Sequence, residues 1–508
     1  MSFDFTQPIT KNTKLVGKFK EPYVIFYTPG SDVAADTVED ADSVRAVMNG
    51  SSYWPNPNNH THLKFTSSCR ELTDITKIGN DSVEMSISEN IKVIEGLSNF
   101  IAVEEIGYGV FRHERITDTL EEITDLPENV ITVGNYFLRG CVNFNSPVSL
   151  PKVKSIGGTF LSTCTSFNSP VSLPEVESIG NSFLYSCPNF NQPIILPEVK
   201  SIGTNFLYGC SDFNHPVTLP KVESVGDYCL GGCTSLNQPV TLPKVKTIGN
   251  YCLANCANFN QPITLPEVTT IGNGFLYRAA NFNQPITLPE VTTIGDSFLY
   301  SATNFNQPVT LPKVTTIGNM FLHSTTVFSQ PIDFPELTSV GNLFVYNKVF
   351  DSPVNLPKLE TTGWSFLSSP ILNQPLDLPE LRSVGDYFIE NSRTLNSPLN
   401  LPKLESIGYG CFSYLNSFNQ PIALPSLKSI SYRCFAELDK MTQTITVPKG
   451  VTYHANMPTT TKDTSFTLLS VDSAAYSTGI KVLGEGADEF LAAYPNTDSP
   501  AVRRLVKG

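Results

Sequence analysis

The sequence predicts a repeat solenoid, an elongated fold that is mainly β with short helical or 3-10 turns and that contains about 13 coils of 23 residues. Three observations support this fold class. A 23-residue period runs from Phe144 to Met441, apolar and polar residues alternate within each unit, and flanking prolines limit each strand to a few residues. The chain is 40% hydrophobic but only 16% charged. Because soluble domains usually carry roughly 25% charged residues, the surface must rely on Asn, Gln, Ser and Thr.

Each unit of the period starts at an aromatic residue or a leucine, with one decayed unit at the end. The consensus is F-N-Q-P-I-T-L-P-x-V-x-x-I-G-x-x-F-L-x-x-C-x-x, and two steps shorten to 22 residues. The units begin at Phe144, Phe167, Phe190, Phe213, Leu236, Phe259, Phe282, Phe305, Phe328, Phe350, Leu372, Leu395, Phe418 and, in the decayed form, Met441. A fixed period of this length predicts one solenoid coil per unit.

The first half of a unit predicts a short strand. In the unit that begins at Phe259, Ile263 and Leu265 point inward and Thr264 points outward, because side chains alternate along a strand. Gly272 is expected to supply a turn whose backbone conformation is costly for other residues. One coil cannot bury its own apolar face, so stability comes from neighbouring coils. Stacking at about 4.8 Å predicts a rod or arc on the order of 60 Å long.

Both ends of the chain depart from the period and predict separate segments. Residues 1–43 are expected to form a small β segment, and residues 44–143 are expected to form degenerate coils and a cap. The solenoid proper covers residues 144–447. Residues 448–508 are predicted to be a C-terminal cap or attachment segment, with a short helix at 487–494.

The repeat resembles a known family. Its L-P-x-V-x-x-I-G-x-x-F-L-x-x-C core is similar to the BspA-like leucine-rich repeats of bacterial and protist surface proteins. The opening Phe259-Asn260-Gln261-Pro262 resembles bacterial surface repeats that begin with Phe-Asn-Gln-Pro-Leu. This resemblance implies a solenoid of the leucine-rich-repeat type, and a role in adhesion or recognition rather than catalysis.

A second resemblance lies at the N-terminus. The segment from Phe3 to Leu15 is similar to the closing half of the Listeria-Bacteroides repeat, although that family usually continues Tyr-Ala-Lys-Trp where this chain has Val-Gly-Lys-Phe at 16–19. The segment from Tyr23 to Gly30 resembles the start of another copy that is not completed. Such surface modules are also displayed on bacteriophage particles, whose proteins leave the host by assembly and lysis. The mosaic therefore implies a surface or virion component.

Cysteines recur at the repeat period and predict a column of side chains. They are Cys141, Cys164, Cys187, Cys210, Cys233 and Cys256, with Cys229 and Cys252 in a second short column. A metal or disulfide column is one interpretation, but structural zinc sites usually bring ligands together in close C-x-x-C pairs. Ala279, Ala302 and Thr325 take the same place in later coils, which indicates a size requirement. The favoured interpretation is therefore a run of small core thiols, and no metal site is predicted.

The outward-facing strand position predicts a polar ladder, which is the candidate binding face. Its members are Ser149, Ser172, Thr218, Thr241, Thr264, Thr287 and Thr310, followed by Asp333, Asn355, Asp377 and Asn400. A row beside it contains Gln192, His215, Gln238, Gln261, Gln284, Gln307 and Gln330. This face could hydrogen-bond a glycan or the edge of a partner, or its side chains could simply bond to each other. The asparagines of the openings, such as Asn191, Asn260, Asn283 and Asn306, are expected to bond to backbone groups at turns.

The other candidates for chemistry lack the spacing that a site needs. His60 and His62 have no nearby cysteine or acidic partner, so a solvated loop at 54–59 is the favoured context. The acidic stretch from Asp32 to Asp42 lacks the D-x-D-x-D-G spacing of a calcium loop and is expected to be an exposed loop. The sequence contains no G-x-S-x-G, H-E-x-x-H or P-loop motif. No catalytic residue and no cofactor are therefore predicted.

Charge and hydropathy argue against two classes of partner. The formal net charge of -13 disfavours nucleic-acid binding, which needs clustered Lys and Arg to neutralise phosphates. No apolar run approaches the roughly 20 residues that span a bilayer. The start of the chain also lacks the basic and apolar stretches of a secretory signal. Neither nucleic-acid binding nor membrane insertion is expected.

These inferences favour a non-enzymatic, virion-associated structural or adhesive protein that decorates the tail or capsid of a bacterial virus. It would be made in the host cytoplasm, attach to other virion proteins through its non-repeat ends, and contact a host-surface glycan or protein. A homo-oligomer is compatible with the sequence. The alternative is a bacterial surface adhesin on the cell surface or in the medium. A third hypothesis, a glycan-active enzyme with the repeats as a binding appendage, needs a pair of carboxylates that neither end offers convincingly.

Overall fold

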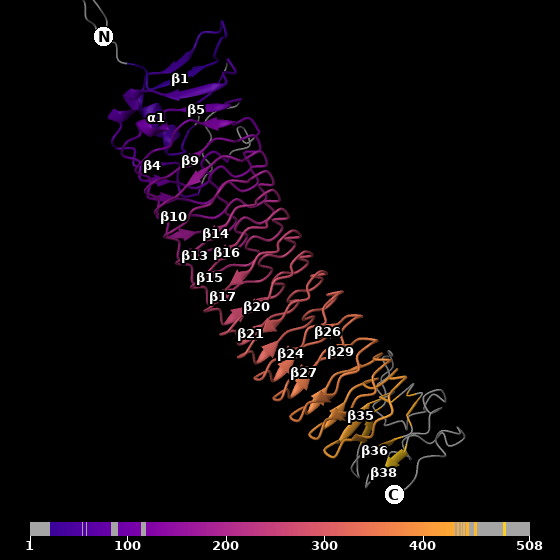
Figure 1. Ribbon diagram of the computed structural model, residues 1–508. Coiled ribbons are helices and arrows are strands. Elements are labelled where there is room, and N and C mark those ends of the chain that lie inside the picture. The colour runs from indigo at the N-terminus through magenta and orange to yellow at the C-terminus, as the bar shows by residue number, and fades with distance from the viewer. Residues whose placement is uncertain are drawn as a thin grey trace, which may run out of the picture.

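The computed structural model describes residues 21–52, 54–56, 58–82, 90–112 and 118–431, together with 434–435, 438, 440–441, 443–446, 452–454 and 481–483. Figure 1 shows an elongated stack of coils with a small sheet and a helix at its N-terminal end. The predicted fold class is confirmed, because the chain is a β-solenoid of about 14 turns with ~23-residue spacing. The predicted helix at 487–494 and the N-terminal resemblance at 3–19 lie outside the described residues.

One continuous parallel ladder, called the long ladder below, joins the coils along the molecule. Its strands pair in register through equivalent residues, as in Thr270↔Thr293 and Ile271↔Ile294. In order they are β4 (Lys77–Ile78), β6 (Glu105–Ile106), β8 (Thr132–Val133), β10 (Ser155–Ile156), β12 (Ser178–Ile179), β13 (Ser201–Ile202), β15 (Ser224–Val225), β17 (Thr247–Ile248), β19 (Thr270–Ile271), β21 (Thr293–Ile294), β23 (Thr316–Ile317), β25 (Ser339–Val340), β28 (Thr361–Thr362), β31 (Ser383–Val384), β33 (Ser406–Ile407), β35 (Ser429–Ser431) and β37 (Thr452–His454).

A second face of the coils carries short parallel sheets built from the predicted P-I-T-L-P strands. Most of these strands bury the aliphatic residue and expose the polar residue that follows, as Ile286 and Thr287 do. Ile263 is an exception, because it is only half-buried. The sheets are β9 (Val148–Ser149) with β11 (Val171–Ser172); β14 (Val217–Thr218), β16 (Val240–Thr241) and β18 (Ile263–Thr264); β20 (Ile286–Thr287) with β22 (Val309–Thr310); β24 (Ile332–Asp333), β27 (Val354–Asn355), β30 (Leu376–Asp377) and β32 (Leu399–Asn400); and β34 (Ile422–Ala423), β36 (Thr444–Thr446) and β38 (Lys481–Leu483).

The N-terminal end is closed by a five-stranded sheet in the order β2-β1-β3-β5-β7. Its strands are β1 (Val24–Tyr27), β2 (Asp36–Val38), β3 (His62–Phe65), β5 (Val93–Glu95) and β7 (Glu122–Ile123), and the helical segments nearby are α1 (Ala41–Met48), η1 (Ser67–Glu71) and η2 (Leu97–Asn99). The first three strands are antiparallel, whereas β5 and β7 join in parallel. The predicted boundary between residues 43 and 44 falls inside α1. Within the described residues, no helix has the length and hydrophobicity needed to cross a membrane.

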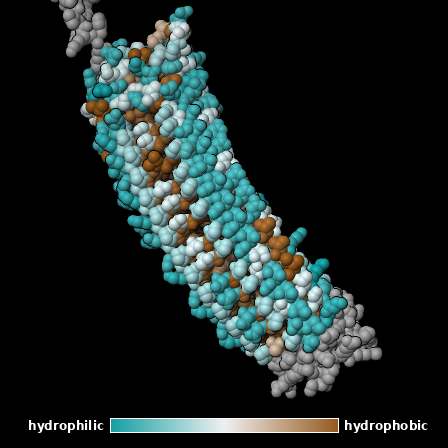
Figure 2. Space-filling view, in the orientation of Figure 1, coloured by the Kyte–Doolittle hydropathy of each residue, from teal (hydrophilic) through white to brown (hydrophobic). Residues whose placement is uncertain are grey.

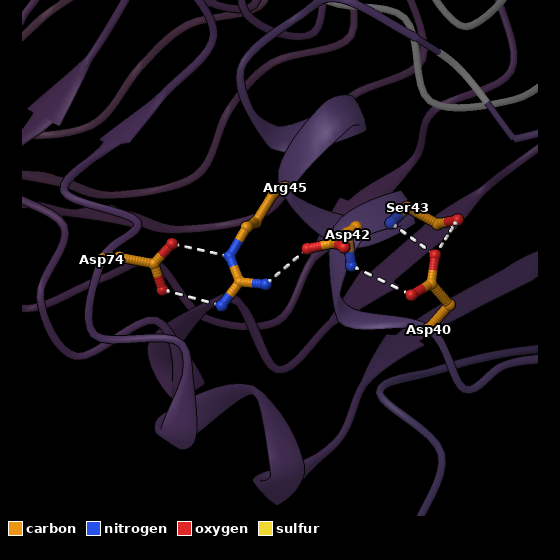
Figure 3. Close-up of polar contacts among 5 residues, drawn as sticks. All are labelled: Asp40, Asp42, Ser43, Arg45 and Asp74. Carbon is orange, nitrogen blue, oxygen red and sulfur yellow. Dashed lines mark hydrogen bonds and ion pairs between the residues drawn. The ribbon is translucent and has the colours of Figure 1, made fainter.

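The helix α1 is fixed at its start by a carboxylate and along its side by an ion pair (Figure 3). Asp40 caps it by accepting hydrogen bonds from the backbone N–H groups of Asp42 and Ser43 at 3.2 and 2.9 Å. Arg45 donates to both oxygens of Asp74 at 2.6 and 3.1 Å, and also to Asp42 at 2.8 Å. The bonds from Ser43 lower the pKa of Asp40, and the bonds from Arg45 lower the pKa of Asp74. The acidic stretch is therefore not a loop throughout, because it contains β2 and the start of α1.

The expectation of a solvated loop before His60 holds for Pro55, Asn58 and Asn59, which are exposed, but not for Trp54. Trp54 is buried, with its ring 6.0 Å from that of Phe26 and 6.1 Å from that of Phe65. His60 is buried too, and its Nε2 lies 3.3 Å from a carboxylate oxygen of Asp36. Trp54 packs against Phe26 of β1 and Phe65 of β3, although it stands at the start of an otherwise exposed segment. These two strands supply apolar contacts that are distant in sequence.

The core consists of columns of equivalent side chains, one from each coil, most of which are the same residue type along a column. Phe144, Phe167 and Phe190 stack at 5.8 and 5.7 Å between ring centroids, with interplanar angles of 6° and 3°. A second phenylalanine column contains Phe160 and Phe183, whose rings are 5.4 Å apart. All of these rings are fully buried. Replacing one with alanine would cost about 3–5 kcal/mol, because it would remove a large apolar surface and leave a cavity.

Gly272 does not have the strained backbone that the sequence suggested. Its φ is not positive. The glycine is required because a Cβ there would lie only 2.8 Å from the carbonyl carbon of Gly249 in the preceding coil. The left-handed conformations occur instead at the next corner, as at Ser297 (φ 60°), Leu299 (φ 56°) and Ser301 (φ 54°). Their N–H groups bond to carbonyl groups of adjacent coils at 2.6, 3.0 and 2.9 Å, which offsets the strain.

The two shortened coils, which begin at Phe328 and Phe350, build this corner differently. They lack the residue before the cysteine position, which is itself occupied by the buried Asn347 and Ser369, and only Leu343 and Ser365 keep a positive φ at this corner. The corner straightens into β26 (Val345–Tyr346) and β29 (Leu367–Ser368), which pair in parallel. The loss of one residue therefore converts a left-handed corner into a pair of strands.

Candidate binding surfaces

The structure places the predicted polar ladder on one exposed column. Thr218, Thr241 and Thr264 pair in register, as do Thr287 and Thr310. Asp333, Asn355, Asp377 and Asn400 continue the column in a four-stranded sheet. Most of these side chains are exposed, and Thr241 is half-exposed. We call Thr218, Thr241, Thr264, Thr287, Thr310, Asp333, Asn355 and Asp377 the polar column.

The hydroxyl groups of the polar column do not bond to each other in the described part of the chain. At the acidic end, amide side chains bond to carboxylates: Asn355 donates to Asp333 at 2.8 Å, and Asn400, which follows the column, donates to Asp377 at 2.7 Å. The threonine hydroxyls of Thr218 to Thr310 face solvent and are available to a ligand. The structure thus brings the predicted residues together, and whether they bind a partner stays a prediction.

The glutamine row is less available than the sequence suggested. Its side chains are half-buried, and several donate to the asparagine of the preceding coil: Gln192 to Asn168 at 3.3 Å, Gln261 to Asn237 at 3.2 Å and Gln284 to Asn260 at 3.2 Å. His215 takes the same place and contacts the backbone oxygen of Asn191 at 3.1 Å. Gln238 and Gln307 are half-buried in this row as well. The row supports the coil stacking more than it offers free amide groups.

The opening asparagines bond to backbone groups, as predicted, but they do so between coils. The Oδ1 atom of Asn260 accepts from the backbone N–H of Asn283 at 2.9 Å, and that of Asn283 accepts from Asn306 at 2.9 Å. A second column of this kind lies directly after the glycine that recurs in each coil. There, Asn273 accepts from the backbone N–H of Asp296 at 2.7 Å. The repeated Gly-Asn and Gly-Asp pairs carried the signal for this second column, which the sequence reasoning missed.

Charged side chains on the coils pair with the opposite charge on the next coil. Lys221 lies 2.5 Å from Glu198, Lys313 lies 2.7 Å from Glu290, and Lys403 lies 2.7 Å from Glu380. Exposed pairs of this kind add little stability. Because the opposite charges alternate, these columns of paired lysines and glutamates carry little net charge and do not attract a highly charged polymer.

The cysteine column lies in the core. Cys187 donates to the backbone oxygen of Leu161 at 3.0 Å, and Cys210 donates to that of Leu184 at 3.0 Å. Burial raises the pKa of Cys187 to about 12 and the pKa of Cys210 well above its usual value. All the cysteines of both columns are free and buried. The thiols therefore act as small core groups that also satisfy carbonyl oxygens at the left-handed corner.

A row of aromatic rings on the coil surface is the main feature that sequence reasoning missed. We call it the aromatic row, and it contains Tyr185, Tyr208, Tyr228, Tyr251, Tyr277, Tyr300, His323 and Tyr346. Neighbouring rings stack at 5.5 Å for Tyr185 and Tyr208 and at 4.9 Å for Tyr277 and Tyr300. His323 lies 5.1 Å from both Tyr300 and Tyr346. Because its members occupy two different positions in the repeat, the row is not visible as one periodic column in the sequence.

The surface of the solenoid is otherwise mostly polar. Figure 2 shows broad hydrophilic bands along the molecule with a narrow hydrophobic stripe between them. Some exposed apolar side chains lie outside the aromatic row, among them Ile195, which is 71% exposed. Stacked coils, a buried core of repeated columns and long uniform faces define the class of protein as a leucine-rich-repeat solenoid.

Comparison with known proteins identifies the family. The sequence model described as "BspA type Leucine rich repeat region (6 copies)" matches residues 76–214, 212–328 and 372–468. These matches cover more than half of the chain, and the protein belongs to the BspA-type leucine-rich repeat family. A comparison with curated proteins gave no match.

The comparison with solved structures matched leucine-rich repeat proteins of low sequence identity. A leucine-rich repeat protein from Bacteroides ovatus is 15% identical, with a TM-score of 0.37, and the match covers 82% of this chain and 84% of that one. A leucine rich cell surface protein from Faecalibacterium prausnitzii is 14% identical, with a TM-score of 0.23, over 78% of this chain and 87% of that one. The assignment of the family rests on the repeat match and not on these superpositions.

Proposed function

We propose that this protein is a non-enzymatic binding protein displayed on a surface, and that the surface is a virion. The non-repeat ends attach it to the tail or capsid, and the solenoid contacts polymers of the host surface. The observation that supports this proposal most is the uniformity of the exposed faces, which repeat the same polar or aromatic side chain over many coils. Faces of this kind suit an extended partner better than a small molecule.

The second candidate is a bacterial surface adhesin, on the cell surface or in the medium. The family match favours it, because the BspA-type repeat is found in bacterial surface proteins. The solenoid would bind in the same way, but the protein would be attached to a cell or released from one.

The test is to search purified particles of the source for this chain by mass spectrometry and cryo-electron microscopy. A defined copy number per particle, with the solenoid projecting outward, would support the virion role and identify the attached end. If the particles lack the chain and it is found on cells or in culture medium, the virion proposal fails and the adhesin remains.

A further inference from the structure

We propose that the aromatic row binds an extended, neutral glycan chain, with about one sugar unit per coil. The inference rests on the proposed function as a surface-displayed binding protein, and it names the ligand class and the face that binds it. At a coil spacing of about 4.8 Å, the row from Tyr185 to Tyr346 is roughly 35 Å long. This length accommodates at least a hexasaccharide.

The row is maintained even where the repeat changes. In six of its coils the ring comes from the position after the core Phe-Leu pair, as in Tyr208 and Tyr277. In the two coils between them, that position holds Gly231 or Ala254, and the ring comes instead from Tyr228 or Tyr251. The rings still meet, at 5.7 Å between Tyr208 and Tyr228.

The space around Gly231 is consistent with the change in the position that supplies the ring. A Cβ at this position would lie 3.0 Å from the ring of Tyr208, so the small residue leaves room for the neighbouring rings. In these two coils the phenylalanine column is interrupted by the buried Cys229 and Cys252. Tyr228 is 38% exposed and Tyr251 is half-buried, so neither ring takes the place of the missing phenylalanine in the core. A continuous row preserved through an exchange of positions points to a role at the surface.

The row presents hydroxyl groups and ring edges rather than ring faces. Most neighbouring rings are nearly parallel, at 10° for Tyr277 and Tyr300 and 8° for Tyr300 and His323, so they cover each other's faces. Tyr228 and Tyr346 are 38% and 44% exposed, and the other rings are half-buried. Within the described residues, the phenol hydroxyls of the row make no hydrogen bond to the protein. Each can therefore donate to and accept from a ligand hydroxyl, which is the chemistry that a glycan chain offers.

The surroundings of the row select a neutral ligand. The flanking side chains are mostly small or amide groups, such as Ser186, Asn205 and Ser301. Burial lowers the pKa of His323, which keeps this ring neutral at physiological pH. The guanidinium of Arg278 lies 5.1 Å from the ring of Tyr277. Asp227 precedes Tyr228 and Lys348 follows close after Tyr346, so the charges near the row are few and of both signs and do not form the continuous basic track that a polyanion needs.

An extended peptide is a poorer fit, because the backbone beside the row is already used. The N–H groups of Arg278, Ser301 and Ser324 donate to the carbonyl groups of the next coil at 2.8, 2.9 and 3.1 Å. A peptide that binds by strand addition needs free backbone groups along a sheet edge. A chain of sugars needs only side-chain hydroxyls and ring edges.

The experiment measures binding of the full chain to cellohexaose and N-acetylchitohexaose by calorimetry, with polygalacturonate as the anionic comparison. We expect at least one neutral hexasaccharide to bind and polygalacturonate not to bind. The double variant Tyr277→Phe/Tyr300→Phe keeps the stacked rings and removes two hydroxyls. It should weaken binding roughly three- to tenfold and leave the unfolding midpoint close to that of the wild type.

The matched control is Thr287→Val/Thr310→Val, which changes the polar column of neighbouring coils and should leave glycan binding unchanged. Three results would overturn the proposal: no binding of either neutral hexasaccharide, preferential binding of polygalacturonate, or a loss in the threonine variant that equals the loss in the tyrosine variant. These results do not depend on where the protein is displayed. A failure of the glycan proposal and a failure of the virion proposal are therefore distinguishable.

Discussion

At the scale of single residues, the distance between coils decides which side chains fit. Gly295 follows a strand of the long ladder, and a Cβ there would lie 2.4 Å from the Oδ1 atom of Asn273 and 2.8 Å from the carbonyl carbon of Gly272. Gly158 lies in an earlier coil, one residue after the position equivalent to Gly295. A Cβ added at Gly158 would have no neighbouring atom closer than 3.4 Å. Neither glycine has a positive φ, so the two differ mainly in available space.

This difference predicts the effect of adding one methyl group. Gly295→Ala should lower the free energy of unfolding by about 1–3 kcal/mol, because neighbouring coils must move apart. Gly158→Ala is the matched control and should have little effect. Urea denaturation of the two variants measures the difference, and equal losses would show that the close approach of the coils is not the cause.

The cysteine column predicts how stability depends on pH. The pKa of Cys187 is raised by burial to about 12 from a usual value of 9.0, so the folded chain keeps a thiol proton that the unfolded chain loses. The stability that this provides is complete below pH 9, and it falls as the pH rises toward 12. Each such thiol can add up to ~1.4 kcal/mol per pH unit to the slope.

The variant Cys164→Ala/Cys187→Ala/Cys210→Ala removes three of these groups. Alanine already occupies the same column at Ala279 and Ala302, so the fold should persist. Between pH 8 and pH 11, the urea midpoint of the variant should fall less steeply than that of the wild type. Parallel curves would mean that other groups control the alkaline response.

At the scale of the coil, hydrogen-bonded columns hold each element to the next. Asn260 accepts both the backbone N–H of Asn283 and the side chain of Gln284. Asp351 occupies the equivalent position in a later coil and accepts from the backbone N–H of Asn373 and from Gln374. An oxygen acceptor is therefore the requirement, and an amide is only one way to supply it.

Substitutions at Asn260 test this requirement. Asn260→Ala leaves a backbone donor without its partner and should cost about 1–2 kcal/mol of unfolding free energy. Asn260→Asp keeps the acceptor and should be tolerated, as Asp351 is. Thermal melts of both variants give the measurement, and an equal loss for alanine and aspartate would contradict the role of the oxygen.

The features of the coil that could be predicted are those for which the residues of a single 23-residue unit contain the pattern. The P-I-T-L-P strands, the polar column and the core position of the cysteines all follow from alternation and spacing. The glycine conformation was predicted wrongly, because sequence shows that glycine recurs but not whether space or φ requires it. The aromatic row and the β26–β29 pair were missed, because each depends on an exchange or a deletion between coils. Burial of Trp54 and His60 depends on a sheet formed by residues distant in sequence.

At the scale of the molecule, the solenoid is a sum of coils, each in contact mainly with its two neighbours. Removing residues 259–281 takes out one complete unit and joins equivalent positions. We expect this deletion to fold cooperatively and to shorten the molecule by about 4.8 Å, because the coils on either side present matching faces. Circular dichroism melts and small-angle X-ray scattering measure the two effects.

The control is a deletion of residues 259–269, which removes about half a coil. It interrupts the phenylalanine columns and the strand register, so the chain should lose its cooperative transition. If the full-coil deletion unfolds as readily as the half-coil deletion, the coils are not interchangeable units.

The alternating charges along the coils also affect which duplications and losses of repeat units the protein tolerates. At one position of successive coils the side chains are Lys154, Glu177, Lys200, Glu223 and Lys246. Lys200 pairs with Glu177 at 2.5 Å, and Lys246 pairs with Glu223 at 3.5 Å. Duplication or loss of a single unit there sets like charges side by side, whereas a change of two units preserves the alternation. The next coils carry threonine at this position, from Thr269 to Thr338, so a gain or loss of one unit there brings no like charges together. Because each exposed pair contributes little stability, the alternation favours the addition of coils in pairs in the first half of the repeat region without excluding single additions, and no such preference acts in its middle.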